Sequence, residues 1–350
     1  MSLTRRGKVF VAAVTMLLVV GGALAYFVVF PQNAPAIVKR TLSSVGLVEE
    51  PPPPPPPCPL TGEQAPGGVP ERPVLAVKIE NYPDARPQAG LQAADIVYEE
   101  PVEGGITRFI VLYHCHDDPR VGPVRSARTL DPDVLSQFGI PILAYSGGAP
   151  HVVRAIDKAD LIPLDETTGA AAMRRDPSRE APHNLYADTR DLYELGASDA
   201  PAPAPTPVFA YSETLPSPSR KVSTVHLPYS TTVADVYWNW SRRAGAWVRS
   251  HGQERHLVEG GEQVSADNVV VQVVEVVVGP RGGITPHVEL TGSGKAYVFR
   301  NGRMVVGRWE RPTLGDVTRF LTKAGREIAL APGRTWVELL PSTVAVGTSR

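Results

Sequence analysis

Two arginines in the stretch VGPVRSAR (121–128) are the first residues of this chain that could do chemistry. Arg125 and Arg128 lie three residues apart, directly after a Gly-Pro pair. A planar guanidinium suits paired hydrogen bonds to a carboxylate or a phosphate. If the segment is helical, the two arginines share one face, and if it is extended they diverge. The stretch therefore predicts contact with an acid, which belongs either to the protein itself or to a ligand.

The other candidate ligand contacts lie on loops and strand ends of the same region. Pro83 and Pro87 restrain a polar loop, so its side chains are held in place. A histidine and an asparagine follow Pro182, and such a pair can orient a ligand hydroxyl or transfer a proton. The predicted ligand-binding residues are Asn81, Arg86, Arg108, Arg125, Ser126, Arg128, His183 and Asn184.

Two adjacent glutamates are candidates for acid-base catalysis together with His183. If their segment is a strand, Glu99 and Glu100 point to opposite faces, so they make a poor acid/base pair with each other. Arg108 begins the next predicted strand, and we expect it to pair with Glu99 or Asp95. A structural ion pair and a catalytic role both stay open for these residues.

The run HCHDD (114–118) raises the question of a metal. Two histidines two positions apart on a strand can share one ion, but no third ligand follows at a recognisable spacing. The chain also lacks a phosphate-binding Gly-rich loop and a Gly-x-Ser-x-Gly nucleophile motif. We predict no metal and no cofactor.

The cysteines are only two, Cys58 and Cys115. In an oxidising compartment they could form a disulfide that ties the end of a Pro-rich stalk to the first domain. Two unpaired thiols are the alternative, and the sequence leaves both open.

The elements that must position these residues follow from the hydrophobic pattern. Short apolar strands alternate with capped helices up to about residue 197, whereas period-two strands and an Asn-Gly hairpin follow residue 220. The sequence thus predicts an α+β fold, with a mixed α+β domain (73–198), a Pro-rich linker (199–220) and a β-rich domain (221–346). Expected strands are 74–79, 94–99, 107–113, 233–240, 267–278 and 334–340, with a hairpin at 295–309; expected helices are 132–138, 151–159 and 188–195.

The N-terminal 72 residues predict a membrane anchor and a stalk. Residues 9–30 carry no charge, and as a helix they would span ~33 Å, which matches a hydrocarbon core of ~30 Å. The basic residues in 1–8 place the N-terminus in the cytoplasm and the rest of the chain outside. A cleaved signal peptide is the alternative, because Ala23-Leu24-Ala25 resembles a cleavage site. Residues 31–72, with seven consecutive prolines, predict a stiff spacer.

The charge balance argues against nucleic acid as a partner. The chain has 35 basic and 36 acidic residues, so no net positive field gathers nucleic acid. Expected partners are the cell membrane, through residues 9–30, and an anionic cell-wall ligand.

Several long motifs resemble the YerB-like family (DUF3048). They are PLTG (59–62), NYPDARPQAGLQAADIVYEEPVEGGITRF (81–109), VGPVRSAR and APHNLY (181–186), followed by DNVVVQ, GSGKAYVFRNG and PGRTWVELLP. The resemblance covers nearly everything from 58 to 346. It implies an exported bacterial protein, membrane-anchored or lipoprotein-like, and it implies no particular reaction. This chain differs from lipoprotein relatives because it has an apolar helix where they carry a lipidated cysteine.

Three functions remain for the structure to separate. The first is a membrane-tethered module that binds an anionic envelope ligand through an arginine-rich cleft. The second is an envelope hydrolase or transferase with Glu/His acid-base chemistry, and the third is a scaffold with internal Arg–carboxylate pairs. Binding predicts that Arg125, Arg128, Glu99 and His183 meet in one open cleft, whereas a scaffold predicts a separate carboxylate for each arginine.

Overall fold

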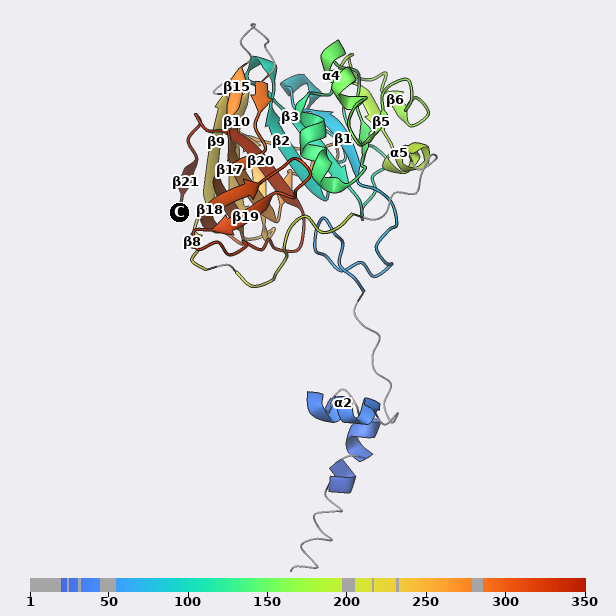
Figure 1. The fold of residues 1–350 in the computed structure, drawn as a ribbon, viewed down its shortest axis with the longest axis vertical. Helices are drawn as coiled ribbons and strands as arrows, with labels where there is room; N and C mark the ends of the chain where they lie inside the picture. The colour runs from blue at the N-terminus through green and yellow to red at the C-terminus, as the bar shows by residue number, and fades with distance from the viewer. Residues whose placement is uncertain are drawn as a thin grey trace, which may run out of the picture. The chain divides into compact units, whose positions relative to one another are not determined.

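Runs of β-branched residues build the central sheet of this fold. The computed structural model describes residues 20–23, 25–30, 33–44, 55–196, 205–215, 217–230, 233–278 and 286–350. The chain divides into two compact units, Met1–Pro54 and Pro55–Arg350, each described by itself (Figure 1). All features below belong to the second unit unless stated otherwise.

The first unit contributes helical residues 20–23 and 25–29 and the helix α2 (Ala36–Ser44). Within the described part of the chain, no helix is both long enough and apolar enough to cross a membrane. The predicted span 9–30 lies largely outside the described residues.

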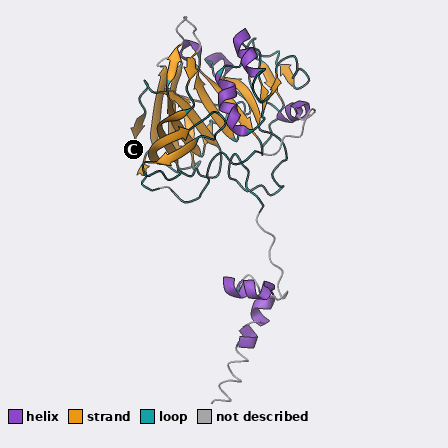
Figure 2. Ribbon diagram, in the orientation of Figure 1, coloured by secondary structure: helices purple, strands orange, loops and turns teal. Residues whose placement is uncertain are grey.

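The larger sheet has eleven strands in the order β19-β18-β17-β14-β20-β2-β3-β1-β4-β5, with β8 also paired to β18. Figure 2 shows the strands in orange. Its strands are β1 (Leu75–Glu80), β2 (Ile96–Pro101), β3 (Thr107–Tyr113), β4 (Ile142–Ala144), β5 (Ile162–Leu164), β8 (Arg220–Lys221), β14 (Asn268–Val274), β17 (Gly292–Arg300), β18 (Arg303–Arg311), β19 (Arg319–Thr322) and β20 (Thr335–Pro341).

A six-stranded sheet has the order β12-β11-β10-β9-β21, with β13 paired to β11. Its strands are β9 (Thr224–Ser230), β10 (Ala234–Ser241), β11 (Ala246–His251), β12 (Glu254–Arg255), β13 (Ser265–Ala266) and β21 (Gly347–Ser349). Two short hairpin-like pairs complete the described strands: β6 (Met173–Arg175) with β7 (Leu185–Ala187), and β15 (Val276–Val278) with β16 (Pro286–Val288).

Three helices of this unit agree with the predicted positions to within a few residues. They are α3 (Leu130–Leu135), α4 (Pro150–Ile156) and α5 (Thr189–Gly196). Pro150 opens α4, where the missing N–H of proline removes no helical hydrogen bond. The predicted mixture of α and β elements with a β-rich C-terminal region is therefore confirmed.

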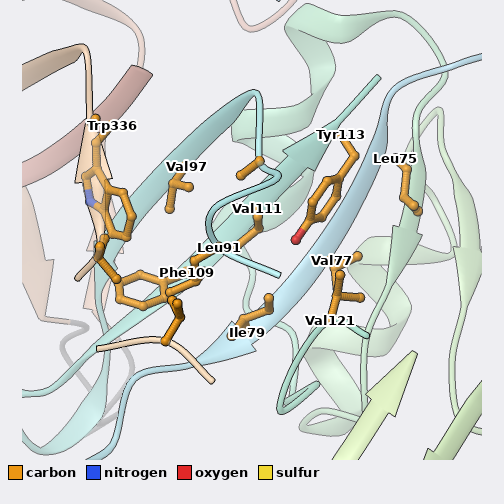
Figure 3. Packing of buried hydrophobic residues seen from close by; sticks show 14 of the residues in the cluster. Leu75, Val77, Ile79, Leu91, Val97, Phe109, Val111, Tyr113, Val121 and Trp336 are labelled. Atoms are coloured by element: carbon orange, nitrogen blue, oxygen red, sulfur yellow. The ribbon is translucent and has the colours of Figure 1, made fainter. Parts of the chain in front are cut away.

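One sheet runs through both halves of the chain. Strand β2 pairs in parallel with β20, so that Val97 lies opposite Trp336 and Glu99 lies opposite Glu338. Trp336 then packs edge-on against Phe109 of β3, with ring centroids 5.1 Å apart (Figure 3). Because residues from both halves share one sheet and one core, residues 73–198 and 221–346 do not form two independently packed bodies.

The two faces of this sheet bury different sets of residues. Val97 belongs to the hydrophobic cluster shared with the six-stranded sheet, while Ile96 and Tyr98 belong to the cluster shared with α3 and α4. Period two along β2 therefore sends Glu99 and Glu100 to opposite faces, as the sequence pattern predicts.

A disulfide joins Cys58 to Cys115, whose Cα atoms lie 6.1 Å apart. It ties the beginning of the second unit to the chain just after β3.

Loss of this disulfide should measurably lower the free energy of unfolding. The bond closes a loop across a sequence separation of 57. In the chain-entropy model such a loop contributes about 4 kcal/mol. We expect urea unfolding of the Cys58→Ser/Cys115→Ser variant to give a free energy lower by about that amount. A loss below about 1 kcal/mol would show that the unfolded chain is not constrained by the bond.

Candidate functional site

The VGPVRSAR stretch lies in extended form between the carboxyl ends of β1 and β4. The Arg125 N–H donates to the Lys78 carbonyl at 2.8 Å, and the Ser146 N–H donates to the Arg125 carbonyl at 3.0 Å. Val124 also forms a bridge with Ile79. Since the segment is extended, Arg125 and Arg128 diverge rather than share a face.

Glu80, the last residue of β1, holds Arg125 and His183 side by side. Its side chain is only 3% exposed, and its two oxygens contact Arg125 Nε at 3.0 Å and His183 Nδ1 at 2.8 Å. The Arg125 and His183 side chains are 26% and 19% exposed. Among the described residues, no hydrogen bond involves the two terminal nitrogens of Arg125 or Nε2 of His183. A buried carboxylate thus orients two groups whose remaining donors are unused.

Further contacts link this pair into a ring of residues, which is closed by the peptide bond between His183 and Asn184. Arg175 donates to Glu166 at 2.6 Å and to Asn184 Oδ1 at 2.9 Å, and Ser146 Oγ donates to Glu166. Ser146 is also joined to Arg125 by the hydrogen bond from its backbone N–H to the Arg125 carbonyl. We call this set the polar ring: Glu80, Arg125, Ser146, Glu166, Arg175, His183 and Asn184.

The topology explains why these residues meet. Strands β1, β4 and β5 run parallel to one another, so their carboxyl ends lie at one edge of the sheet. Glu80 ends β1, Ser146 follows β4 and Glu166 follows β5. In sheets of this type, ligands bind outside the carboxyl ends of the strands.

Arg128 and Arg108 lie outside the ring. Arg128 donates to Glu103 Oε2 at 2.7 Å and to the Ala127 carbonyl at 2.8 Å. Arg108 is buried and donates to the Ser126 carbonyl at 2.9 Å, and burial followed by the charge of Arg128 lowers its pKa to about 10. The expectation that Arg108 pairs with Glu99 or Asp95 is therefore wrong, and Ser126 contributes a carbonyl that binds both arginines.

Glu99 is fully buried and is held by Arg249 of β11. Arg249 Nη2 lies 2.7 Å from each carboxylate oxygen, while Trp336 Nε1 donates at 3.1 Å and Thr107 Oγ1 at 2.6 Å. Glu99 therefore cannot touch a substrate at the surface in this structure, which corrects its assignment as a catalytic candidate.

Glu100 is also fully buried, on the opposite face. It pairs with Lys78, whose Nζ also lies 2.5 Å from Asp131 Oδ1. Burial raises the pKa of Glu100 to about 7 against the attraction of Lys78. Glu100 is thus part of an interior ion cluster. Because it is buried as Glu99 is, its assignment as a catalytic candidate is corrected as well.

Asn81 and Arg86 belong to the interior network around Glu99. Asn81 Nδ2 donates to Thr107 Oγ1 at 2.7 Å, and Arg86 donates to the Asn81 carbonyl at 2.9 Å. Burial, followed by repulsion from Arg249, lowers the pKa of Arg86 to about 10. Of the predicted ligand contacts, the polar ring contains Arg125, His183 and Asn184.

The sequence pattern did not single out Glu80 or Glu166. The available signal for Glu80 was a charged residue that closes a mostly apolar strand, VLAVKIE (74–80). No local signal relates Glu166 to Arg175, which lies nine residues later on β6 of the two-stranded sheet β6-β7.

The two histidines of HCHDD have separate partners. His114 Nε2 lies 3.2 Å from the Arg72 carbonyl, and His116 Nδ1 lies 2.6 Å from Asp95 Oδ1. Within the described residues, no group of three or more His, Cys, Asp or Glu side chains is placed to hold a metal.

Family comparison agrees with the motifs. The N-terminal and C-terminal domains of the protein of unknown function DUF3048 match residues 60–202 and 225–337. The chain belongs to the DUF3048 family. A relative from Bacillus subtilis (strain 168), named "Putative lipoprotein YerB", is 29% identical over 306 residues, which is 83% of this chain and 88% of the relative.

A solved structure shows the same fold. The crystal structure of YerB protein from Bacillus subtilis superposes with a TM-score of 0.73 at 24% identity, covering 83% of this chain and 99% of that one. The two DUF3048 domains defined by sequence thus share the eleven-stranded sheet, in which β2 pairs with β20.

Proposed function

We propose that this DUF3048 protein is a membrane-anchored, extracytoplasmic binding protein that holds an anionic group of a cell-envelope polymer at the polar ring. The observation that supports this most directly is the arrangement at Glu80. One buried carboxylate binds Arg125 through Nε and His183 through Nδ1, and it leaves three nitrogens of these side chains unused within the described structure.

The chemistry of the ring suits a phosphate or carboxylate that is attached to a polyol or sugar. The terminal nitrogens of a guanidinium form a planar fork for an oxyanion, and the imidazole adds a neighbouring contact. Ser146 and Glu166 add a hydroxyl and a carboxylate to the same set, and such groups can bind ligand hydroxyls. Because Glu80 and Glu166 balance the two arginines, affinity should come from geometry rather than from net charge.

Three observations support a location outside the cytoplasm. The Cys58–Cys115 disulfide is typical of oxidising compartments. A relative carries the name of a lipoprotein. Residues 9–30 carry no charge and follow a basic N-terminus, as in a single-pass anchor with the C-terminal region outside.

The pairing of Glu80 with His183 favours a second candidate function. A carboxylate that holds Nδ1 of a histidine, and leaves Nε2 for a substrate, is the arrangement used for proton transfer in many hydrolases. An envelope hydrolase or transferase would then use His183 as the base and Glu80 as the residue that orients it.

The scaffold alternative is supported by the ion pairs, because the arginines of the ring also have carboxylate partners: Glu80 for Arg125 and Glu166 for Arg175. Arg128 pairs with Glu103, and Arg120 pairs with Asp176 and Glu259. These pairs stabilise loops, so substitution of Arg128 provides a control for substitution of Arg125.

Binding should depend on Arg125 and not on Arg128. We expect the Pro55–Arg350 unit to bind soluble poly(glycerol phosphate) or a muropeptide in calorimetric titration, and Arg125→Gln to weaken that affinity at least about tenfold through loss of a charge-assisted contact. Arg128→Gln should leave it unchanged.

Equal binding by wild type and Arg125→Gln would contradict the proposal. Release of a cleavage product by the wild type, lost in His183→Gln while binding persists, would decide for the enzyme instead. Mass spectrometry of the ligand after incubation distinguishes these outcomes.

A further inference from the structure

A small cavity lies at the edge of the sheet opposite the polar ring. The polar ring surrounds the carboxyl ends of parallel strands, whereas this cavity lies where β2, β14 and β20 begin and the antiparallel β3 ends. Its volume is about 150 Å³, and its polar lining consists of Thr61, Glu63, Gln92, His116, Asp267 and Arg334. It therefore unites the PLTG, HCHDD and PGRTW motifs, none of which the polar ring uses.

Arg334 lines this cavity, and the charges of Asp267, Asp95 and Glu63 act on its guanidinium from a distance. Its Nε donates to the Ala94 carbonyl at 3.0 Å, and its Nη1 donates to the Ser265 carbonyl at 2.9 Å and lies 3.3 Å from Gln92 Oε1. All three acceptors are neutral. Within the described residues, no carboxylate forms a salt bridge with this guanidinium, and its Nη2 has no hydrogen-bond partner. Burial lowers the pKa of Arg334, as expected for a partly buried cation.

His116 stands at the mouth of the cavity in a fixed orientation. Asp95, which is fully buried, accepts the backbone N–H of His114 at 2.5 Å and of Cys115 at 3.1 Å, and its other oxygen holds His116 Nδ1 at 2.6 Å. The Cys58–Cys115 disulfide restrains the same turn. The His116 side chain is 49% exposed, and the hydrogen bond to Asp95 raises its pKa.

Two carboxylates complete the wall. Asp267 accepts the backbone N–H of Arg334 at 2.8 Å, while Glu63 is exposed. Within the described part of the chain, neither forms an ion pair with the Arg334 or His116 side chain. Among the described residues, the cavity thus presents positive and negative side chains with no direct ion pair between Arg334 and either carboxylate, which is the complement of a ligand carrying both charges.

We propose that this cavity binds a small free α-amino acid. Arg334 Nη2 would hold the ligand carboxylate, Asp267 and Glu63 its ammonium group, and His116 would cover the entrance. A cavity of about 150 Å³ suits a small amino acid such as glycine or alanine.

Calorimetric titration of the Pro55–Arg350 unit with glycine, L-alanine and D-alanine tests this proposal. We expect a dissociation constant of about 1 mM or tighter for at least one of them. Propionate and ethylamine, which each lack one of the two charges, should bind at least about tenfold more weakly.

Two variants locate the binding. Glu63→Gln changes an exposed side chain and should weaken binding at least about tenfold, as should His116→Gln. The matched control is His226→Gln, because His226 forms a similar pair with Asp235 at 2.6 Å but does not line the cavity. His226→Gln should bind like the wild type.

The proposal is overturned if none of the three amino acids binds. It is also overturned if propionate binds as tightly as alanine, since the cavity is then a plain anion site, or if Glu63→Gln and His116→Gln bind like the wild type. Thermal unfolding of each variant without ligand shows whether it is folded, and Arg125→Gln should bind the amino acid normally because the polar ring is a separate site.

Discussion

Substitution of Arg249 by methionine should lower the free energy of unfolding by about 3–5 kcal/mol, the range measured when one partner of a buried ion pair is removed. Arg249 is fully buried between the two sheets, and its Nη2 binds both oxygens of Glu99. Methionine fills much of the same volume but leaves the Glu99 carboxylate without its cation. Urea unfolding with a two-state fit measures the difference.

The histidines around Arg249 enlarge this effect. Nη1 lies 2.6 Å from His251 Nε2 and 2.7 Å from His256 Nδ1, and His256 Nε2 contacts Gln88 Oε1 at 2.8 Å. Burial, followed by the charge of Arg249, lowers the pKa of both histidines, so they are neutral and accept from the arginine. Removal of Arg249 leaves these acceptors unpaired as well.

Two further variants separate loss of charge pairing from loss of packing. Glu99→Gln in the Arg249→Met background should recover part of the stability, because a neutral amide costs less to bury than an unpaired carboxylate. Arg243→Met, in an exposed turn between β10 and β11, should stay within about 0.5 kcal/mol of the wild type. A loss below about 1 kcal/mol for Arg249→Met would contradict the assigned role of Arg249.

Substitution of Glu338 by glutamine should stabilise the protein, and increasingly so as the pH rises. Glu338 is fully buried opposite Glu99, and burial followed by repulsion from Glu99 raises its pKa well above 4.5. Its oxygens bind Trp238 Nε1 at 2.6 Å and the Tyr229 hydroxyl at 3.0 Å, and the amide of glutamine can make both contacts.

The direction of this pH dependence follows from the uptake of a proton by Glu338 on folding. Above about pH 4.5 the unfolded chain carries ionised Glu338, whereas the folded chain keeps the proton. The stability contributed by this group is therefore full below the unfolded pKa and is lost at about 1.4 kcal/mol per pH unit as the pH rises toward the folded pKa. Glutamine removes this dependence, so the advantage of the variant should grow as the pH rises above about 4.5.

The measurement compares the two proteins by urea unfolding across this pH range. The difference between them is the informative quantity, because the neutral histidines 251 and 256 give the wild type an opposite slope below about pH 6.5. A pH-independent difference would show that Glu338 is ionised in the folded protein.

The sequence predicts strands well where one face is buried, and it predicts their pairing poorly. Val97 and Glu99 lie on one face of β2, as period two requires. The parallel pairing of β2 with β20 spans more than 230 residues, and no local pattern specifies it. The consequence is that Glu99 pairs with Arg249 of β11, although the nearest arginine in the sequence pattern is Arg108.

The candidate site shows the same limit. Arg125, His183 and Asn184 could be selected from their residue types and restrained loops, and the structure places them together. Arg128 is an arginine of the same motif as Arg125, but the extended backbone directs its side chain toward Glu103. Glu80 and Glu166 join the ring only because β1 and β5 end at the same edge of the sheet.

The most direct test of the polar ring is the imidazole resonance of His183 in an NMR titration with poly(glycerol phosphate). We expect a saturable shift of the His183 ring in the wild type, a shift that needs at least about tenfold more ligand in Arg125→Gln, and no shift of the His226 ring in either protein. Binding that saturates while the His183 ring stays unchanged would place the ligand elsewhere and contradict the central proposal.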